Sequence, residues 1–345
     1  MTLRFSRLLH LGNVVIDVVL DVPALPDRGG DVRATGSRMA PGGGFNVMAA
    51  AARQGMRVAY GGAHGSGPLA AMARAALADE RIEVLLPPKA GIDTGFVVVM
   101  VDASGERTFV TSRGAEATMT SADLAGIEAA TGDAVYLSGY GLAYPGNRAA
   151  LLDWLGRLGA APTVFVDPGP LVRLIPADVV DRVLARVDWW TCNAREAAAL
   201  AGCADPADAA SALAARARAQ RKAVQRKAVQ PKAVQPKAVQ RAAAQPARSL
   251  GVLVRTGPSG CLLCHPGTAP VRVPGFDVAV VDTNGAGDAH VGAFIAALAS
   301  GADETVAART ANAAAALAVT RRGPATAPDR DELSAFLAQH RVRPA

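Results

Sequence analysis

A run of small residues that ends in an aspartate, Asp282-Thr-Asn-Gly-Ala-Gly-Asp288, carries the most specific chemistry in this sequence. Apolar residues follow it at helical spacing, as Val291, Phe294, Ile295 and Leu298, and Gly301 stands where such a helix should end. The run therefore lies at a helix start, where unpaired backbone N–H groups bind anions, above all phosphate. Gly285, Ala286 and Gly287 are predicted to form this anion hole. Beside it, the Asp288 carboxylate can accept the proton of a hydroxyl that attacks a phosphoryl group.

A simpler interpretation of the run is a turn whose acidic residue stabilises the helix by about 0.3–1 kcal/mol. Taken alone, Gly-Ala-Gly-Asp favours this interpretation over the catalytic one. The helix start also predicts a lowered pKa for Asp288, which would make it a weak base. The preceding segment, residues 271–281, predicts a short β-like approach to the turn.

The elements that must position this run follow an alternating pattern. The chain has 345 residues, of which 50% are hydrophobic and 4% aromatic, so it can bury a large core. Apolar runs bounded by Gly and Pro alternate with Ala-rich helical patterns, which predicts a mostly parallel sheet covered by helices. The predicted strands are 8–15, 164–167, 188–193 and 250–254, with a β-hairpin over 94–101 and 107–111.

The sequence predicts neither a membrane span nor a signal peptide. No stretch of about 18 residues is both apolar and uncharged. The apolar segment 8–20 is interrupted by Asp17, and no small-residue cleavage site follows it. A cytoplasmic protein is therefore expected.

The net charge of +6 is concentrated in one segment. Residues 213–248 hold ten Lys or Arg and no acidic residue, so subtracting these ten leaves −4 for the rest of the chain. Residues 221–240 repeat Arg-Lys-Ala-Val-Gln twice and then Pro-Lys-Ala-Val-Gln twice. A polar repeat of one charge sign predicts a disordered insertion or a loose, solvated helix. A tether to nucleic acid or membrane is the functional alternative. A repeat-expanded surface loop is favoured, because loops tolerate insertions at small entropic cost.

The cysteines are predicted to pack in a buried strand and not to bind haem or a metal. Cys261-Leu-Leu-Cys264-His265 fits a haem-attachment pattern or half of a zinc site. Neither is favoured, because no second Cys/His pair has metal spacing and haem attachment needs export. The segment 260–264 is instead expected to be a buried strand, where cysteine packs as a small hydrophobe.

A second glycine-rich motif, Pro41-Gly-Gly-Gly-Phe-Asn46, precedes an Ala-rich helix that ends near Arg53. It is not a dinucleotide fingerprint, because Val47 holds the place of the third glycine. A Gly-x4-Gly-Lys-Ser/Thr phosphate loop is absent from the sequence.

The two motifs together resemble the signatures of the ribokinase-like (PfkB) carbohydrate kinases. The match covers 282–295 at one end, and the glycine pair, Asn46, Gly55 and Gly65 at the other, whereas Met48 stands where the family has a small residue. The resemblance implies a ribokinase-like three-layer α/β/α core with a mostly parallel sheet and a small β lid. It also implies ATP and Mg²⁺ as cofactors.

The resemblance assigns roles to residues on the sugar side and the nucleotide side. It places Asp17, Gly42, Gly43 and Asn46 in the sugar site, while Arg107 on a lid strand reaches the substrate or only decorates the lid. For the nucleotide it assigns Asn193, Thr256, Gly257, Gly260 and Asn312. Glu196 is assigned to Mg²⁺ through water, although Asn193 and Glu196 also have the spacing of a helix capping box.

Two further expectations come from the resemblance. A monovalent cation such as K⁺ is expected at Asp282, Asn284, Ala318, Arg321 and Gly323, although Ala327 stands where relatives often have a serine ligand. A homodimer through the β lid is the other expectation.

The expected domain plan interleaves the core and the lid. The core is expected over 1–16, 41–92, 113–212 and 249–335, the lid over 17–40 and 93–112, and the disordered basic insertion over 213–248. This plan is typical of one α/β domain that carries an appended lid.

The sequence therefore predicts an ATP-dependent kinase that phosphorylates a primary hydroxyl of a sugar or sugar-like substrate. The alternatives are a nucleoside kinase of the same family and a sugar- or nucleotide-binding regulator without catalysis. A nucleic-acid-binding protein rests on the basic repeat alone and is not favoured. The sequence does not identify the sugar.

Overall fold

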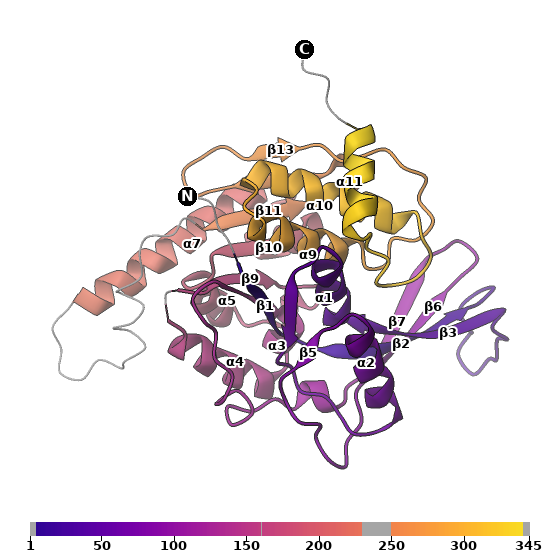
Figure 1. Cartoon of the computed structure of the whole chain (residues 1–345). Helices are drawn as coiled ribbons and strands as arrows, with labels where there is room; N and C mark the ends of the chain where they lie inside the picture. Colours follow the sequence, from indigo (N-terminus) through magenta and orange to yellow (C-terminus); the bar gives the residue numbers. More distant parts are fainter. Residues whose placement is uncertain (1–4, 160, 230–249, 341–345) are drawn as a thin grey trace.

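The computed structural model describes residues 5–159, 161–229 and 250–340, which form a layered α/β body with a smaller sheet at one side (Figure 1). Within this described part, the central sheet has nine strands in the order β13-β12-β11-β10-β9-β8-β1-β4-β5. Their bounds are β1 (Arg7–Leu11), β4 (Arg57–Tyr60), β5 (Glu83–Val84), β8 (Asp133–Ser138), β9 (Thr163–Asp167), β10 (Trp189–Asn193), β11 (Gly251–Arg255), β12 (Cys261–Cys264) and β13 (Val271–Val273). Neighbours from β5 to β11 pair in parallel, while β12 and β13 are added antiparallel. The predicted mostly parallel sheet is confirmed.

Helices cover both faces of this sheet. On one face lie α1 (Gly44–Arg53), α2 (Pro68–Asp79), α9 (Ala286–Ala299), α10 (Glu304–Val319) and α11 (Arg330–Gln339). On the other lie α3 (Gly139–Ala143), α4 (Pro145–Arg157), α5 (Ala177–Leu184), α6 (Ala194–Ala201) and α7 (Pro206–Val229). Short 3-10 turns occupy Ala115–Ala117, Val172–Leu174 and Gly257–Ser259. None of the helices in the described residues has the length and apolar character needed to cross a bilayer.

Successive side chains of each strand enter two separate cores. Because side chains alternate across a strand, Leu9 and Val166 pack with α4, α5 and α7, whereas Leu8 and Phe165 pack with α1, α9 and α10. Burial on both faces explains why these strands are almost continuously apolar. The expected buried strand at the cysteines is confirmed, because all four residues of β12 are buried.

A four-stranded lid sheet projects from the body in the order β3-β2-β6-β7 (Figure 1). Its strands are β2 (Val14–Asp21), β3 (Gly36–Gly43), β6 (Phe96–Val101) and β7 (Arg107–Ser112), and β6 and β7 form the predicted hairpin. The predicted single strand over 8–15 is wrong, because Gly12 and Asn13 separate β1 from β2. The lid sheet therefore begins at Val14 and its β3 strand ends at Gly43, instead of spanning 17–40.

The basic segment differs from expectation where the structure describes it. Residues 213–229 are helical and continue α7, so the prediction of disorder is wrong for this part. Leu213 and Ala217 are fully buried, and Arg216 Nε lies 2.7 Å from Asp181 Oδ1. Core packing and this ion pair hold the first turns of the segment in helical form. Residues 230–248 of the predicted insertion lie outside the described residues.

The approach to the catalytic run is less regular than predicted. Only Val271–Val273 of the β-like segment 271–281 is a strand, and the rest is an extended connection. The helix itself is confirmed as α9, in which Val291, Phe294, Ile295 and Leu298 are buried.

Candidate active site

The side chains of Asn46 and Asp288 meet between α1 and α9. Asn46 Nδ2 donates a hydrogen bond of 2.9 Å to Asp288 Oδ2. The two helices approach closely because Gly292 lacks a side chain, and a Cβ there would lie 2.5 Å from the Val47 carbonyl oxygen. Two motifs far apart in the sequence thus form one site.

The pKa of Asp288 is raised to about 6, which contradicts the lowering predicted from the helix start. Burial is the main cause, and the nearby Asp167 carboxylate adds to it. The Asn46 hydrogen bond and the Arg255 charge act in the opposite direction. Loss of solvation therefore outweighs the helix N-terminus, and Asp288 is a stronger base than the sequence suggested.

The predicted anion hole forms the first turn of α9. Gly285 is the N-cap residue with φ of +73°, a left-handed conformation that favours glycine, and Ala286 and Gly287 open the helix. The left-handed residue of the turn is thus Gly285. A Cβ at Gly287 would instead meet the Arg255 guanidinium, with Nε at 3.4 Å.

The predicted sugar-side residues Asp17, Gly42, Gly43 and Asn46 come together beside Asp288. Asp17 lies within β2 and not at a strand end, and a Cβ at Gly42 would lie 2.5 Å from its carboxylate. Gly43, with φ of +63°, is the N-cap of α1 and turns the lid strand into the helix. The pKa of Asp17 is raised to about 6, mainly by burial and also by the Asp288 charge. Asp17 and Asp288 therefore lie close enough for the charge of Asp288 to act on Asp17.

A cavity of about 880 Å³ opens on the other side of the anion hole. The predicted residues that line it are Asn193, Gly257, Gly260, Ala286, Gly287 and Asn312. Thr256 does not line the cavity but closes its turn, because its Oγ1 donates to the Gly260 carbonyl oxygen at 2.9 Å. Apolar residues that include Phe276, Val278, Val280, Ala315, Ala316 and Val319 form much of the wall.

Asn312 shapes this wall through its amide group. Its Nδ2 donates to the carbonyl oxygens of Val273 and Pro274, each at 3.0 Å. Its Oδ1 lies 3.0 Å from Nε2 of His290, another cavity residue. The amide group of Asn312 is therefore hydrogen-bonded within the protein. These hydrogen bonds fix the side chain in the cavity wall.

Asn193 and Glu196 form the capping box that their spacing allowed. Asn193 Oδ1 accepts from the Glu196 N–H at 2.9 Å, and Glu196 Oε2 accepts from the Asn193 N–H at 2.8 Å. Burial and the Asp167 carboxylate raise the pKa of Glu196 to about 7. Glu196 is thus positioned as a helix cap at the same time as it faces an acidic neighbour.

Arg255, which the sequence analysis did not select, lies at the centre of this region. It ends β11 and lines the cavity, with Nη1 2.8 Å from Asp167 Oδ2 and Nη2 3.7 Å from Glu196 Oε2. These carboxylates raise the pKa of the guanidinium above its ordinary value. The available signal was a charged residue at the end of an apolar strand, directly before Thr256-Gly257.

Arg107 ties the lid to the catalytic run. Its Nη2 forms an ion pair with Asp282, and its Nη1 donates to Thr283 Oγ1 at 3.0 Å. Thr283 also lines the cavity. Arg107 therefore contacts the protein at the site border and holds the lid against the loop that precedes α9.

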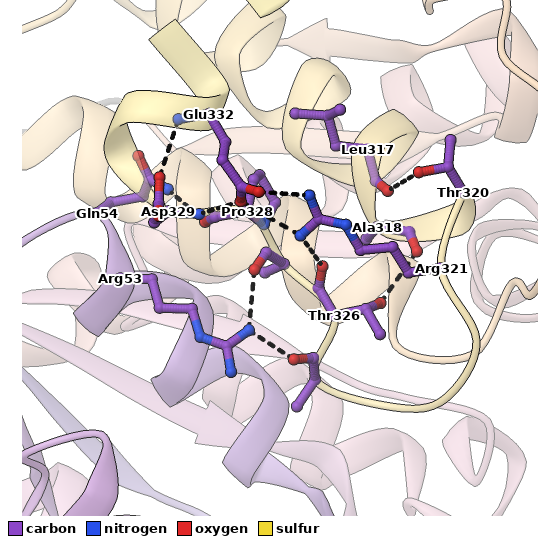
Figure 2. Close-up of polar contacts among 12 residues, drawn as sticks. Arg53, Gln54, Leu317, Ala318, Thr320, Arg321, Thr326, Pro328, Asp329 and Glu332 are labelled. Atoms are coloured by element: carbon purple, nitrogen blue, oxygen red, sulfur yellow. Dashed lines mark hydrogen bonds and ion pairs between the residues drawn. The ribbon is translucent and has the colours of Figure 1, made fainter. Parts of the chain in front are cut away.

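The loop between α10 and α11 is held against the end of α1 by hydrogen bonds (Figure 2). Arg53 of α1 donates to the carbonyl oxygens of Ala325 and Ala327 at 2.6 and 2.9 Å, and Gln54 donates to that of Pro328 at 2.8 Å. A Cβ at Gly285 would lie 3.4 Å from the Ala325 nitrogen. The helix that carries Asn46 thus also fixes the loop behind the anion hole.

Two of the groups expected to hold a monovalent cation, the Asp282 carboxylate and the Ala318 carbonyl oxygen, are engaged with protein donors. Asp282 accepts from the N–H groups of Asn284 and Gly323 at 2.8 and 2.9 Å, besides Arg107. The Ala318 carbonyl oxygen accepts from Thr326 Oγ1 at 3.0 Å and from the Arg321 N–H at 3.2 Å (Figure 2). At Asp282 the Arg107 guanidinium supplies a positive charge where the family resemblance placed the cation.

Comparison with known proteins defines the class. A family model described as pfkB family carbohydrate kinase matches residues 6–331. The chain is 33% identical over 329 residues to the uncharacterized sugar kinase YegV of Escherichia coli, covering 95% of this chain and 93% of that protein. It is 30% identical to the ATP-dependent ribose-1-phosphate kinase of Halopiger xanaduensis, covering 96% and 98%. Ribokinase from Giardia lamblia has the same fold, with a TM-score of 0.77 and 20% identity over 96% of this chain and 99% of that one.

This chain belongs to the PfkB family of carbohydrate kinases. The ribokinase-like fold and the enzyme class predicted from the two motifs are thereby confirmed.

Proposed function

We propose that this kinase transfers a phosphoryl group from ATP to a primary hydroxyl of a neutral sugar or sugar-like acceptor. The observation that carries the proposal is the contact between Asn46 and Asp288. It joins the residues beside the lid to the anion hole, so that an acceptor hydroxyl and a nucleotide phosphate would meet at one carboxylate. An ATP-dependent relative over nearly the whole chain supports ATP as donor.

Asp288 is proposed to accept the proton of the attacking hydroxyl. The described residues give its Oδ2 a hydrogen bond from Asn46, which leaves Oδ1 to face the acceptor. With its pKa at about 6, Asp288 is ionised at neutral pH and is a better base than an ordinary aspartate. The backbone N–H groups at Gly285, Ala286 and Gly287 would hold the phosphoryl group as its charge spreads.

The 880 Å³ cavity is proposed to hold the nucleotide. Its apolar wall at Ala315, Ala316 and Val319 suits the adenine ring, and its end at Gly287 suits the phosphates. Glu196 is proposed to act on Mg²⁺ through water, as the family resemblance implies, while its Oε2 caps α6. When bound, Mg²⁺ would offset the charge of the phosphates.

The charges around the acceptor site favour a neutral substrate. Asp17 and Asp288 face this site, so a phosphate or carboxylate on the acceptor would meet two negative groups. Arg107, which reaches the loop before α9 from the lid, is paired with Asp282. A neutral sugar is therefore the favoured acceptor, and a nucleoside with a free primary hydroxyl is the second candidate.

A screen of ATP consumption tests this proposal. Neutral ketoses and aldoses, nucleosides, sugar acids and ribose 1-phosphate are offered to the wild-type protein and to the Asp288→Asn variant. We expect turnover with a neutral acceptor that the variant lacks. A preference for a sugar acid or a sugar phosphate would overturn the assignment of a neutral acceptor.

A homodimer through the lid is also proposed, on the basis of its outward face. Val18 pairs with Met39 and Val98, and Val98 pairs with Val110, which gives an apolar row across all four strands. Met39 and Val110 are 47% and 57% exposed. Sedimentation should show a dimer that Val110→Lys dissociates, and a monomeric wild-type protein would overturn this assignment.

A further inference from the structure

One edge of the Arg255 guanidinium faces the anion hole. An ideal Cβ at Gly287 would lie 3.4 Å from Nε and 3.7 Å from Nη2 of Arg255. These two nitrogens form the edge of a guanidinium that binds oxyanions in a bidentate manner. The same edge borders the cavity at the point where the backbone N–H groups of the α9 turn gather.

The opposite side of the guanidinium is anchored. Nη1 lies 2.8 Å from Asp167 Oδ2, and Nη2 is only loosely placed at 3.7 Å from Glu196 Oε2. Among the described residues the guanidinium thus has one close carboxylate contact, an ion pair at Nη1 without hydrogen-bond geometry. Asp167 can hold the arginine in place while Nε and Nη2 bind a second oxyanion.

Arg255 also supplies the positive charge at this point of the cavity. Arg255 is the cation that acts on Asp288 and Glu196, and it lowers the pKa of both carboxyl groups. Buried ion pairs add little net stability, so the pair with Asp167 does not by itself account for a cation at this position. The place of Arg255 on the cavity wall beside the α9 turn would suit contact with a phosphate.

We propose that Arg255 binds the transferring phosphoryl group directly, through Nε and Nη2, opposite the N–H groups of residues 285–287. This inference rests on the proposed function, since it assumes that ATP phosphates lie at this turn. A planar cation there would stabilise charge as it spreads over the phosphoryl oxygens. Arg255 is therefore a catalytic residue by contact, and Asp167 is the residue that positions it.

Binding and turnover of Arg255 variants test the proposal. Calorimetry measures the affinities of the wild type, Arg255→Gln and Arg255→Lys for ADP and for a non-hydrolysable ATP analogue. Kinase assays measure kcat with the best acceptor. We expect Arg255→Gln to weaken analogue binding by roughly tenfold or more, to change ADP binding by less than about threefold, and to lower kcat by at least about a hundredfold. Arg255→Lys, which keeps the charge but loses the planar edge, should fall between.

A matched control is Arg7→Gln. Arg7 also forms an ion pair, with Nη2 2.6 Å from Asp133 Oδ2, but at the amino ends of the strands and away from the cavity. Its loss should lower thermal stability without changing the ratio of the two affinities. If Arg255→Gln alone does not fold, Arg255→Gln combined with Asp167→Asn removes the carboxylate left unpaired and restores a measurable protein.

The outcomes separate this inference from the proposed function. Equal loss of affinity for ADP and the ATP analogue, or no loss of either, in a wild-type background that phosphorylates an acceptor would overturn the role of Arg255 alone. A wild-type protein that binds neither nucleotide would overturn both.

Discussion

Asn46 Nδ2 donates to Asp288 Oδ2 at 2.9 Å, across a separation of 242 residues in the chain. This hydrogen bond connects the first helix after the lid with the helix that carries the anion hole. It also sets the chemistry of the site, because it opposes the rise in the Asp288 pKa that burial causes.

Removal of this hydrogen bond should shift the pH profile. A base acts in its ionised form, so kcat/KM should be high above the pKa of Asp288, about 6 in the wild type, and fall below it. Asn46→Leu removes the donor and should move this acidic limb upward by roughly half a unit to one unit. Asp17→Asn removes a neighbouring carboxylate and should not move the limb upward. An unchanged limb in Asn46→Leu would show that Asp288 is not the titrating base.

The raised pKa of Asp288 also predicts a dependence of stability on pH. A carboxyl group whose pKa is higher in the folded state than in the unfolded state binds more protons when the protein is folded. The free energy of unfolding of the protein therefore falls as the pH rises from about 4 to about 6. Asp288→Asn removes this penalty. Denaturant unfolding should show the variant more stable than the wild type by about 1–2 kcal/mol at pH 8, and the gain should vanish near pH 4. A variant that is less stable than the wild type at pH 8 would contradict the assigned burial.

The two glycines of the anion hole should respond differently to substitution. Gly285→Ala forces an alanine into a left-handed conformation and should cost about 1–2 kcal/mol of stability. Gly287→Val should be tolerated better in folding, but its side chain enters the space between the turn and Arg255. Its kcat/KM should fall by about two orders of magnitude or more. Sugar affinity measured without ATP should stay near the wild-type value, and its loss would show that the two sites are wrongly separated.

Arg107 should determine the response to monovalent cations. With its guanidinium at Asp282, the wild type should work equally well in K⁺ and in tetramethylammonium at the same ionic strength. Arg107→Gln leaves the carboxylate without a cation, so K⁺ should stimulate this variant several-fold. Arg38→Gln, which breaks the lid pair with Asp21, is the control and should show no such stimulation. Strong K⁺ dependence in the wild type would contradict this account.

Local patterns predicted much of this molecule. The helix after Asp288 and the capping box at Asn193 were predictable because each depends on residues within a few positions of one another. The break between β1 and β2 was missed because Gly12 and Asn13 interrupt one apolar run that feeds two different sheets. The stretch 213–229 was expected to be disordered or a loose helix because the repeat that begins at Arg221 lacks an apolar face, whereas Leu213 and Ala217, which precede the repeat, pack into the core.

The electrostatics of the site could not be predicted from the sequence. The pKa of Asp288 depends on burial and on Asp167, which lies on a distant strand. The ion-pair partners of Arg255 could not be predicted, because they reach it only when β9, β10 and β11 pair and bring both carboxylates to the same edge of the sheet. Tertiary packing determines these contacts, and a local sequence motif does not predict it.

The most direct test of the account is the kcat of Asp288→Asn, measured together with its affinity for ATP. Asparagine keeps the size of the side chain but cannot take the proton from the acceptor hydroxyl. We expect a fall in kcat of at least about a hundredfold, with the dissociation constant for ATP within about threefold of the wild-type value. A variant that turns over at a near-normal rate would remove Asp288 from the mechanism.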